Sequence, residues 1–458
     1  MERINIKHIS SMNITHSLVE TNFTTKPKFN NVNFNQDSSC FSCSNDEGFQ
    51  IYNTDPLQCK LTKKFKDPNG NGIGFTRMLY RTNYIALVGG GKNPKYSLNK
   101  LVIWDDLIKK ESIVLKFMSN VNDTLLSRSL IVVVLDDHFE LYQFKQNPLK
   151  LFNNFDIPRG SNVEFKVISN EFKKIQNIIA FVSVRRNGQI QIANIPSEKD
   201  LVSLETIPTS IIKAHKTEIQ LIRLNYQGTM VASCSTKGTI IRIFSTHNGS
   251  LIREFRRGLD NAEIYDMEFS PRGTKLAVIS DKQTLHIFQI LGDEGSNKVH
   301  KLKGVIPKTW NLNYLESVWS MCSIHLKNPK LLRNGINSKE YQHNSAEMNL
   351  DFQKQRCKIG WCNNPMDNEP RGSDRTLTDT NERIVSDNED SLVLVWKDSG
   401  IWEKYVILER ESLEEAPTSY NVNESLRNEE TSKIQGRRDN DNNHVREWEI
   451  VRESWREL

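Results

Sequence analysis

Short runs in which apolar and polar residues alternate cover much of the chain after residue 28. This pattern is typical of β-strands, because successive side chains point to opposite faces. The clearest runs form two similar units that start at Glu218 and Glu263. Each unit has an alternating run, a glycine turn, a run of small residues and an apolar run with an aromatic residue near its end. The separation of the two starts matches the ~40–45 residues of one propeller blade.

The same organisation divides the chain into seven units. Six of them span 29–65, 75–118, 121–157, 163–216, 218–257 and 263–326, and the seventh begins at Cys357. Because no long helix is indicated, we predict an all-β fold, a seven-bladed WD40-like β-propeller. In this fold the first strand of each blade lines the channel and the fourth forms the rim. The run 251–257 is then the rim strand of blade five.

Several segments fall outside this pattern. We expect a disordered N-terminal tail at 1–27, which is polar and rich in Asn and Thr, and a propeller over 28–458. Four inserts interrupt the propeller, at 291–317 in blade six and, with low complexity, at 328–355, 363–390 and 411–443. The last segment, 445–458, fits a strand or a short helix, and its alternation favours a strand that closes blade seven.

Composition excludes several classes of function. A net charge of +5 favours anionic partners only weakly, and the basic residues form no aromatic-lined stripe of the kind that binds nucleic acid. Seven scattered cysteines indicate reduced thiols. The chain has no apolar leader and no apolar run of about 18 residues, so we expect only peripheral membrane contact. Catalytic motifs, metal-ligand spacings and a complete phosphate loop are also missing, so we expect no enzyme, metal or cofactor.

Two adjacent arginines, Arg256 and Arg257, lie at the junction of blades five and six. Neighbouring side chains on a strand point to opposite faces, so each guanidinium is expected to reach toward a different neighbouring blade. The planar fork of arginine binds phosphate oxygens in a bidentate way, which suits two anions bound side by side. A solvated edge strand protected by positive charge is the alternative, and the dipeptide alone leaves it open.

The insert at 291–317 combines basic and bulky residues. Its lysines are followed by a cluster made of Trp310, Leu312, Tyr314 and Leu315. Lysines contact anionic headgroups while aromatic and aliphatic groups enter the membrane interface. The pattern therefore fits a membrane-surface segment, and it fits equally a loop that packs back onto the propeller.

Six stretches of the sequence resemble the PROPPIN family, seven-bladed propellers that bind phosphoinositides through a Phe/Leu-Arg-Arg-Gly motif. The stretches are FRRG at 255–258, ALVGGGKNPKYSLNKLVIWDD at 86–106, KAHK at 213–216, MVASCSTKGTIIRIF at 230–244, FSPRGTKLAVISDKQTLHIF at 269–288 and WKDSGIWEKYVILE at 396–409. The modest inserts make the chain similar to the compact fungal members of the family.

The resemblance implies two phosphoinositide pockets on either side of the arginine pair. The residues of pocket 1 are His215, Ser235, Thr239, Arg242 and Arg256. Those of pocket 2 are Arg257, Thr284 and His286, to which we add Ser280 and Lys282 from their position on the same hairpin. The resemblance also implies that the insert carrying Trp310 and Leu312 dips into the bilayer.

The family implies a non-catalytic, monomeric, peripheral membrane protein. Its expected ligands are phosphatidylinositol 3-phosphate and phosphatidylinositol 3,5-bisphosphate, and its expected role is in autophagy, including selective microautophagy, and in vacuolar and endosomal traffic. It would be cytoplasmic and would associate with vacuolar, endosomal and pre-autophagosomal membranes, with autophagy proteins bound through other blades. The alternative function is a propeller scaffold that binds acidic protein partners without lipid.

Overall fold

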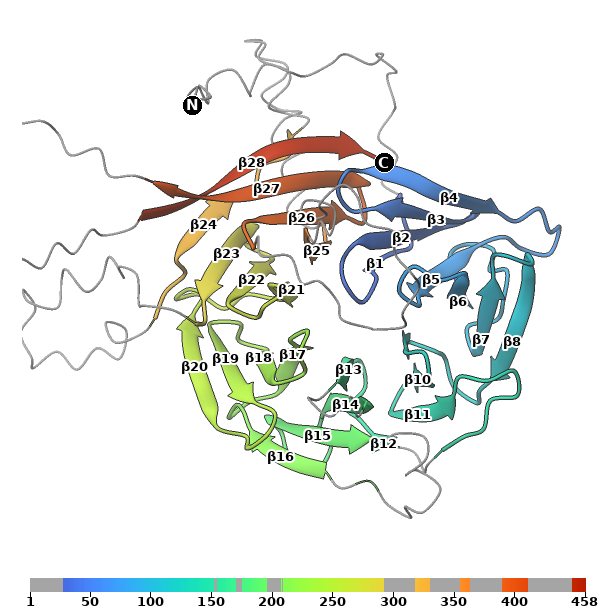
Figure 1. Ribbon diagram of the computed structural model, residues 1–458, viewed down its shortest axis with the longest axis horizontal. Helices are drawn as coiled ribbons and strands as arrows, with labels where there is room; N and C mark the ends of the chain where they lie inside the picture. Colours follow the sequence, from blue (N-terminus) through green and yellow to red (C-terminus); the bar gives the residue numbers. More distant parts are fainter. Residues whose placement is uncertain are drawn as a thin grey trace, which may run out of the picture.

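The structure is a computed structural model that describes residues 28–151, 155–169, 175–195, 207, 209–291, 318–329, 355–362, 389–410 and 447–458. These residues form seven antiparallel four-stranded sheets arranged around a central axis (Figure 1). Each sheet is a meander of four strands that are consecutive in the sequence. The predicted seven-bladed β-propeller is therefore confirmed.

The strands of the first four blades follow the predicted units. Blade one contains β1 (Asn31–Phe34), β2 (Cys40–Asn45), β3 (Gly48–Asn53) and β4 (Gln58–Lys64). Blade two contains β5 (Ile73–Met78), β6 (Tyr84–Gly89), β7 (Lys100–Asp105) and β8 (Lys110–Lys116). Blade three contains β9 (Asp123–Leu126), β10 (Leu130–Val134), β11 (His138–Gln143) and β12 (Phe155–Asp156). Blade four contains β13 (Val163–Ser169), β14 (Ile175–Val182), β15 (Gln189–Ile195) and β16 (Thr209–Lys213).

The last three blades include the segments interrupted by inserts. Blade five contains β17 (Ile219–Leu224), β18 (Met230–Ser235), β19 (Ile240–Ser245) and β20 (Leu251–Arg256). Blade six contains β21 (Ile264–Phe269), β22 (Lys275–Ser280), β23 (Thr284–Gln289) and β24 (Cys322–His325). Blade seven contains β25 (Cys357–Trp361), β26 (Ser391–Trp396), β27 (Ile401–Arg410) and β28 (Glu447–Glu457).

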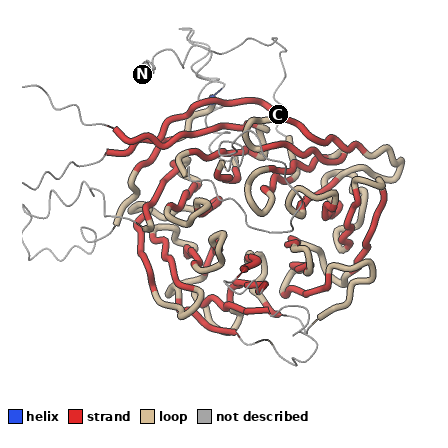
Figure 2. Tube along the Cα trace, in the orientation of Figure 1, coloured by secondary structure: helices blue, strands red, loops and turns tan. Residues whose placement is uncertain are grey.

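The inner strands of the blades are more buried than the rim strands. Strand β10 reads LIVVV and is buried along its whole length, because blades cover both of its faces. Rim strands such as β20, which reads LIREFR, are mostly exposed or half-buried. The core is divided into seven apolar clusters, each of which lies between two successive blades. The fold is therefore held by packing between blades as well as by strand pairing within them. Figure 2 shows the strands, in red, arranged in successive blades around the ring.

Blade seven closes the ring against blade one without exchanging a strand. The C-terminal segment forms β28 and pairs with β27, so the preference for a strand there is confirmed. The main-chain N–H of Lys28 donates to Asp398 O at 2.8 Å, and the indole of Trp402 donates to Thr54 O at 3.2 Å. The Lys404 ammonium pairs with Asp55 at 2.8 Å. These two hydrogen bonds and the ion pair join blade seven to blade one.

All seven cysteines are free, and six of them are buried. This agrees with the expected reduced thiols. Gly89 and Gly90, at the end of β6, pack closely against the backbone of Tyr96 and Gly74. No helix among the described residues is long and apolar enough to cross a bilayer.

Candidate functional site on the rim of blades four to six

The two arginines diverge at the end of rim strand β20. Arg256 pairs in register with Ile240, and Arg242 pairs with Glu254, so these four side chains share one face of blade five. Phe255 is fully buried on the other face, where its ring lies 4.9 Å from that of Phe288 in blade six. Since residue 257 continues this alternation, Arg256 faces blade four and Arg257 faces blade six.

On the blade-four side the structure brings together most of the residues predicted for pocket 1. His215 follows β16, and its Nε2 lies 2.9 Å from the Ser233 hydroxyl on β18. Arg242 lies directly across from Ser233 on β19 and donates to Ala214 O at 2.6 Å. Burial, followed by the charge of Arg242, lowers the pKa of His215 to about 4. A neutral imidazole therefore sits beside a guanidinium at neutral pH.

Ser235 and Thr239 flank the turn between β18 and β19. Ser235 is buried at the end of β18, on the same strand face as Ser233, and Thr239 immediately precedes the residue paired with Arg256. Among the described residues, the recorded contact of Thr239 is its carbonyl, which accepts the main-chain N–H of Arg257 at 2.9 Å. The turn thus holds the main chain of Arg257 by a backbone hydrogen bond.

The turn requires a glycine between Ser235 and Thr239. Gly238 has a φ of 60°, and a Cβ there would lie 1.9 Å from Ala262 O. Its carbonyl accepts a hydrogen bond from Arg257 Nε at 3.0 Å. Any larger residue would displace the loop that positions Arg257.

Arg257 is more buried than a rim position suggests, with only 6% of its surface exposed. Besides Gly238 O, its guanidinium donates to Asp260 O. Burial lowers the pKa of Arg257, while the nearby carboxylates of Asp281 and Asp260 oppose this shift. Arg257 therefore follows a rim strand and is buried, whereas Arg256 is half-buried. Arg257 also organises the chain that follows β20.

The residues predicted for pocket 2 lie where Arg257 approaches blade six. His286 lies on β23, facing blade five, and its Nδ1 is 3.3 Å from the Ser320 hydroxyl. Burial, followed by the charge of Arg257, lowers the pKa of His286 to about 4. Thr284 precedes it on the same face and lies 3.5 Å from His325 Nδ1 on β24. The structure therefore brings Arg257, Thr284 and His286 together.

The two added residues of pocket 2 differ in their environment. Ser280 is fully buried, and its hydroxyl accepts the main-chain N–H of Lys282 at 3.3 Å. The Lys282 ammonium is exposed and lies 3.8 Å from the Asp281 carboxylate. Ser280 therefore shapes the hairpin turn, while Lys282 offers a charge at its surface.

Sequence reasoning missed four polar residues around these pockets. Ser233 contacts His215 in pocket 1, and the carboxylate of Glu254 accepts a hydrogen bond from Arg242 at 2.7 Å. Ser320 and His325 reach pocket 2 from the far side of the 291–317 insert. The alternation on β20 could have identified Glu254, which lies two residues before Arg256. Nothing in the sequence marks Ser320 or His325, because the insert at 291–317 separates them from β23.

The insert returns beside the arginine pair. Val318 forms a parallel bridge with Phe255, and its carbonyl accepts the main-chain N–H of Arg256 at 2.9 Å. Strand β24 then runs along β23 to Thr284. The predicted membrane residues Trp310, Leu312, Tyr314 and Leu315 lie outside the described residues. The described residues that flank the insert are Leu291, which follows β23, and Val318, which is bonded to Arg256.

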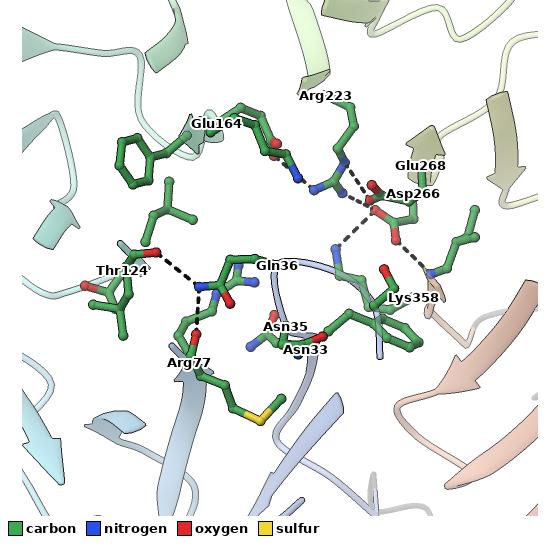
Figure 3. A pocket seen from close by; sticks show the side chains of 18 residues that line it. Asn33, Asn35, Gln36, Arg77, Thr124, Glu164, Arg223, Asp266, Glu268 and Lys358 are labelled. Atoms are coloured by element: carbon green, nitrogen blue, oxygen red, sulfur yellow. Dashed lines mark hydrogen bonds and ion pairs between the residues drawn. The ribbon is translucent and has the colours of Figure 1, made fainter. Parts of the chain in front are cut away.

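A separate charged cluster lies in the central channel, in a cavity of about 110 Å³ lined by all seven inner strands (Figure 3). Arg223 on β17 pairs with Glu164, Asp266 and Glu268 at 3.0, 2.6 and 3.3 Å. Lys358 on β25 adds a pair with Asp266 at 3.4 Å. Burial raises the pKa of Glu268 to about 7. This network joins blades four to seven, the frame on which both pockets are built.

Comparisons with known proteins agree with the geometry. The PROPPIN family model matches residues 29–360. The chain belongs to the PROPPIN family. It is 50% identical to SVP1-like protein 2 of Saccharomyces cerevisiae, across 94% of this chain and 97% of that protein. The Candida glabrata protein of the same name is 46% identical, across 94% and 96%.

Solved structures of PROPPINs have the same fold. Hsv2 of Kluyveromyces lactis, with a complete loop 6CD, aligns with a TM-score of 0.62 and 28% identity, covering 94% of this chain and 99% of that chain. Hsv2 of Kluyveromyces marxianus aligns with a TM-score of 0.61 and 26% identity over the same shares. The predicted resemblance to compact fungal PROPPINs is therefore confirmed. PROPPINs are known for phosphoinositide binding in autophagy and are generally non-catalytic binding proteins.

Proposed function

We propose that this PROPPIN binds phosphatidylinositol 3-phosphate and phosphatidylinositol 3,5-bisphosphate through pockets 1 and 2. One observation carries the proposal. The adjacent arginines at the end of β20 face opposite neighbouring blades, and each of those blades contributes one of the two low-pKa histidines. Guanidinium, imidazole and hydroxyl groups together supply the charge and hydrogen bonds that phosphate oxygens need.

Two pockets on one edge favour coincident binding to a membrane. Each headgroup site alone is weak, because phosphate must lose strongly held water and its charge is screened by salt. Two sites that face the same surface act through effective concentration, which raises avidity by ~10²–10⁴. The disc would therefore stand on edge, with blades five and six toward the membrane.

The insert that joins β23 to β24 would provide the third contact. Its described ends lie at Leu291 and at Val318, and Val318 is bonded to Arg256. Trp310, Leu312, Tyr314 and Leu315 would enter the interface, where burial contributes about 25 cal/mol per Å². Lysines of the insert would add up to about 1 kcal/mol each beside an anionic leaflet.

In the cell, this binding would act in autophagy, including selective microautophagy, and in vacuolar and endosomal traffic. The protein would be cytoplasmic and monomeric, and it would bind vacuolar, endosomal and pre-autophagosomal membranes. Protein partners would use blades that do not face the membrane. A propeller of this fold is known from the complex of KlAtg21 with the coiled coil of AgAtg16, at 20% identity.

A calorimetric titration with soluble dibutanoyl phosphatidylinositol 3-phosphate tests the two pockets. We expect two binding sites for the wild type, one remaining site in Arg256→Ala and one in His286→Asn. The double variant should bind none. A single site that either substitution abolishes would contradict two separate pockets.

A further inference from the structure

A continuous ribbon of turns and links runs along one face of the ring from blade four to blade six. It consists of the turns between the second and third strands of these blades and of the links that join one blade to the next. Main-chain hydrogen bonds connect these segments in order, from His215 N to Gly188 O at 2.9 Å, from Thr236 N to Glu218 O at 3.0 Å, from Ala262 N to Lys237 O at 3.0 Å and from Asp281 N to Glu263 O at 2.9 Å. Because His215 lies on the ribbon, pocket 1 borders it.

The blade-four end of this ribbon is basic. Four exposed cations lie there, namely Arg185 and Arg186 in the turn of blade four, Lys216 in the link to blade five and Lys237 in the turn of blade five. We call these four residues the basic turn sector. In the part of the chain that the structure describes, none of the four forms an ion pair, and the same two turns and link carry one carboxylate, Glu218. None of the four belongs to pocket 1 or pocket 2.

The corresponding turns of other blades differ in charge. In blades one and three this turn is acidic and contains Asp46-Glu47 and Asp136-Asp137. In blade six the Lys282 ammonium lies 3.8 Å from the Asp281 carboxylate, which offsets its charge. Along the ribbon, uncompensated positive charge is therefore concentrated beside pocket 1.

The turn of blade four is held firmly against pocket 1. Gly188 has a φ of 73°, and a Cβ there would lie 2.0 Å from His215 O. Its carbonyl accepts the main-chain N–H groups of both Ala214 and His215 at 2.9 Å. The Ser183 hydroxyl accepts the main-chain N–H of Arg185 at 3.3 Å. The two arginines of this turn therefore project from a fixed backbone next to the pocket histidine.

We propose that the basic turn sector binds the headgroup of a second anionic phospholipid, phosphatidylserine, beside the phosphoinositide in pocket 1. The inference rests on the proposed function, which brings the end of blade five to a membrane. The phosphatidylserine headgroup carries a phosphodiester and a carboxylate, and the planar fork of Arg185 or Arg186 binds either anion in a bidentate way. Lys216 and Lys237 add attraction to the surrounding anionic leaflet.

A membrane fits this sector better than an acidic protein segment does. A lipid bound at His215 would bring the neighbouring headgroups of the same leaflet to the turn that is bonded to that histidine. Val184 precedes the two arginines and is 53% exposed, so it offers an apolar side chain to the membrane interface. The protein would then bind a phosphoinositide membrane more tightly when its leaflet also contains phosphatidylserine.

The test compares flotation with vesicles of phosphatidylcholine and phosphatidylinositol 3-phosphate that contain or lack phosphatidylserine. We expect phosphatidylserine to tighten binding of the wild type at least tenfold. In Arg185→Ala/Arg186→Ala this gain should fall below about threefold, because two cations near the leaflet are lost. The variant should still bind soluble dibutanoyl phosphatidylinositol 3-phosphate like the wild type, since both arginines lie outside the pockets.

The matched control is Lys60→Ala/Lys110→Ala, which removes the same charge from two exposed lysines on the rim strands of blades one and two. It should keep the full gain from phosphatidylserine. Folding is checked by the thermal midpoint, and Lys216→Ala/Lys237→Ala repeats the test with the other two residues of the sector.

Three results would overturn the inference while leaving the pockets in place. These are normal headgroup binding by a wild type that gains nothing from phosphatidylserine, a full gain in Arg185→Ala/Arg186→Ala, and an equal loss of the gain in the control, which would show only general charge attraction. A wild type that binds no soluble headgroup would instead refute the proposed function, and this inference with it. Binding of a polyglutamate peptide that Arg185→Ala/Arg186→Ala abolishes, with an unchanged gain from phosphatidylserine, would assign the sector to a protein partner.

Discussion

Arg256 and Arg257 should respond differently to truncation, although they are adjacent. Arg257 is 6% exposed and donates to the carbonyls of Gly238 and Asp260. A hydrogen bond with a charged partner contributes about 1.5–3 kcal/mol, and water can partly replace the lost donors at the rim. We expect Arg257→Ala to lower the free energy of unfolding by about 2 kcal/mol, which corresponds to a thermal midpoint lower by roughly 2–5 °C.

Arg256 is half-buried, and the structure ties its main chain to Val318. Its truncation keeps that backbone bond, so we expect a change in stability of at most about 0.5 kcal/mol. Vesicle binding should nevertheless weaken at least tenfold, because the guanidinium would contact the phosphate directly. Arg257→Lys keeps the charge but loses the fork, and it should fall between wild type and Arg257→Ala in stability.

The assay combines thermal unfolding followed by tryptophan fluorescence with vesicle sedimentation at a temperature where every variant is folded. Equal destabilisation by Arg256→Ala and Arg257→Ala would refute this reasoning. So would an Arg257→Ala variant with the midpoint of the wild type, since the two carbonyl contacts would then have no energetic role.

Three further predictions follow from the same structure. Burial lowers the pKa values of His215 and His286 to about 4, so both imidazoles stay neutral in the folded protein. In the unfolded chain the same histidines take up protons below about pH 6.5. The free energy of unfolding should therefore fall as the pH drops from 6.5 to 4. His286→Gln should make that fall shallower in urea titrations, and an unchanged slope would contradict the assignment. Glu403 is fully buried and accepts hydrogen bonds from Arg452 and Trp396. Arg452→Ala leaves the Glu403 carboxylate buried without its charged partner, so it should lower the free energy of unfolding by about 3–5 kcal/mol. The double variant Glu403→Gln/Arg452→Gln removes both charges and should lower it less. A smaller loss for Arg452→Ala than for the double variant would contradict this explanation. Trp310→Asp/Leu312→Asp should weaken binding to vesicles and spare binding to a soluble headgroup, and equal loss of both would assign the insert a role in folding.

The alternation of short strands was enough to predict the propeller and its seven units. It placed the arginine pair on the rim of blade five, because the run before Arg256 follows three other strands of the same unit. The C-terminal strand was harder to recognise, since residues 445–458 alternate only weakly. Hydrogen bonding to β27 stabilises this segment as a strand, although its own sequence favours a strand only weakly.

The environment of each pocket residue could not be predicted in the same way. The burial of Arg257 depends on the loop that ends at Asp260 and on the carbonyl of Gly238, neither of which is marked by any local pattern. His325 reaches Thr284 only because β24 pairs with β23 across a long insert. The network around Arg223 joins residues from four blades, and long-range ion pairs leave no periodic signal in the sequence.

The most direct test of the central claim is flotation of the wild type and of Arg256→Thr/Arg257→Thr with vesicles. The vesicles would carry no phosphoinositide, phosphatidylinositol 3-phosphate or phosphatidylinositol 3,5-bisphosphate. We predict that the wild type floats only with the phosphoinositide vesicles and that the double variant, measured at a temperature where it is folded, stays at the bottom of the gradient. Flotation of the folded double variant like the wild type would contradict the two pockets, and a wild type that floats with none of the vesicles would favour a scaffold that binds acidic proteins.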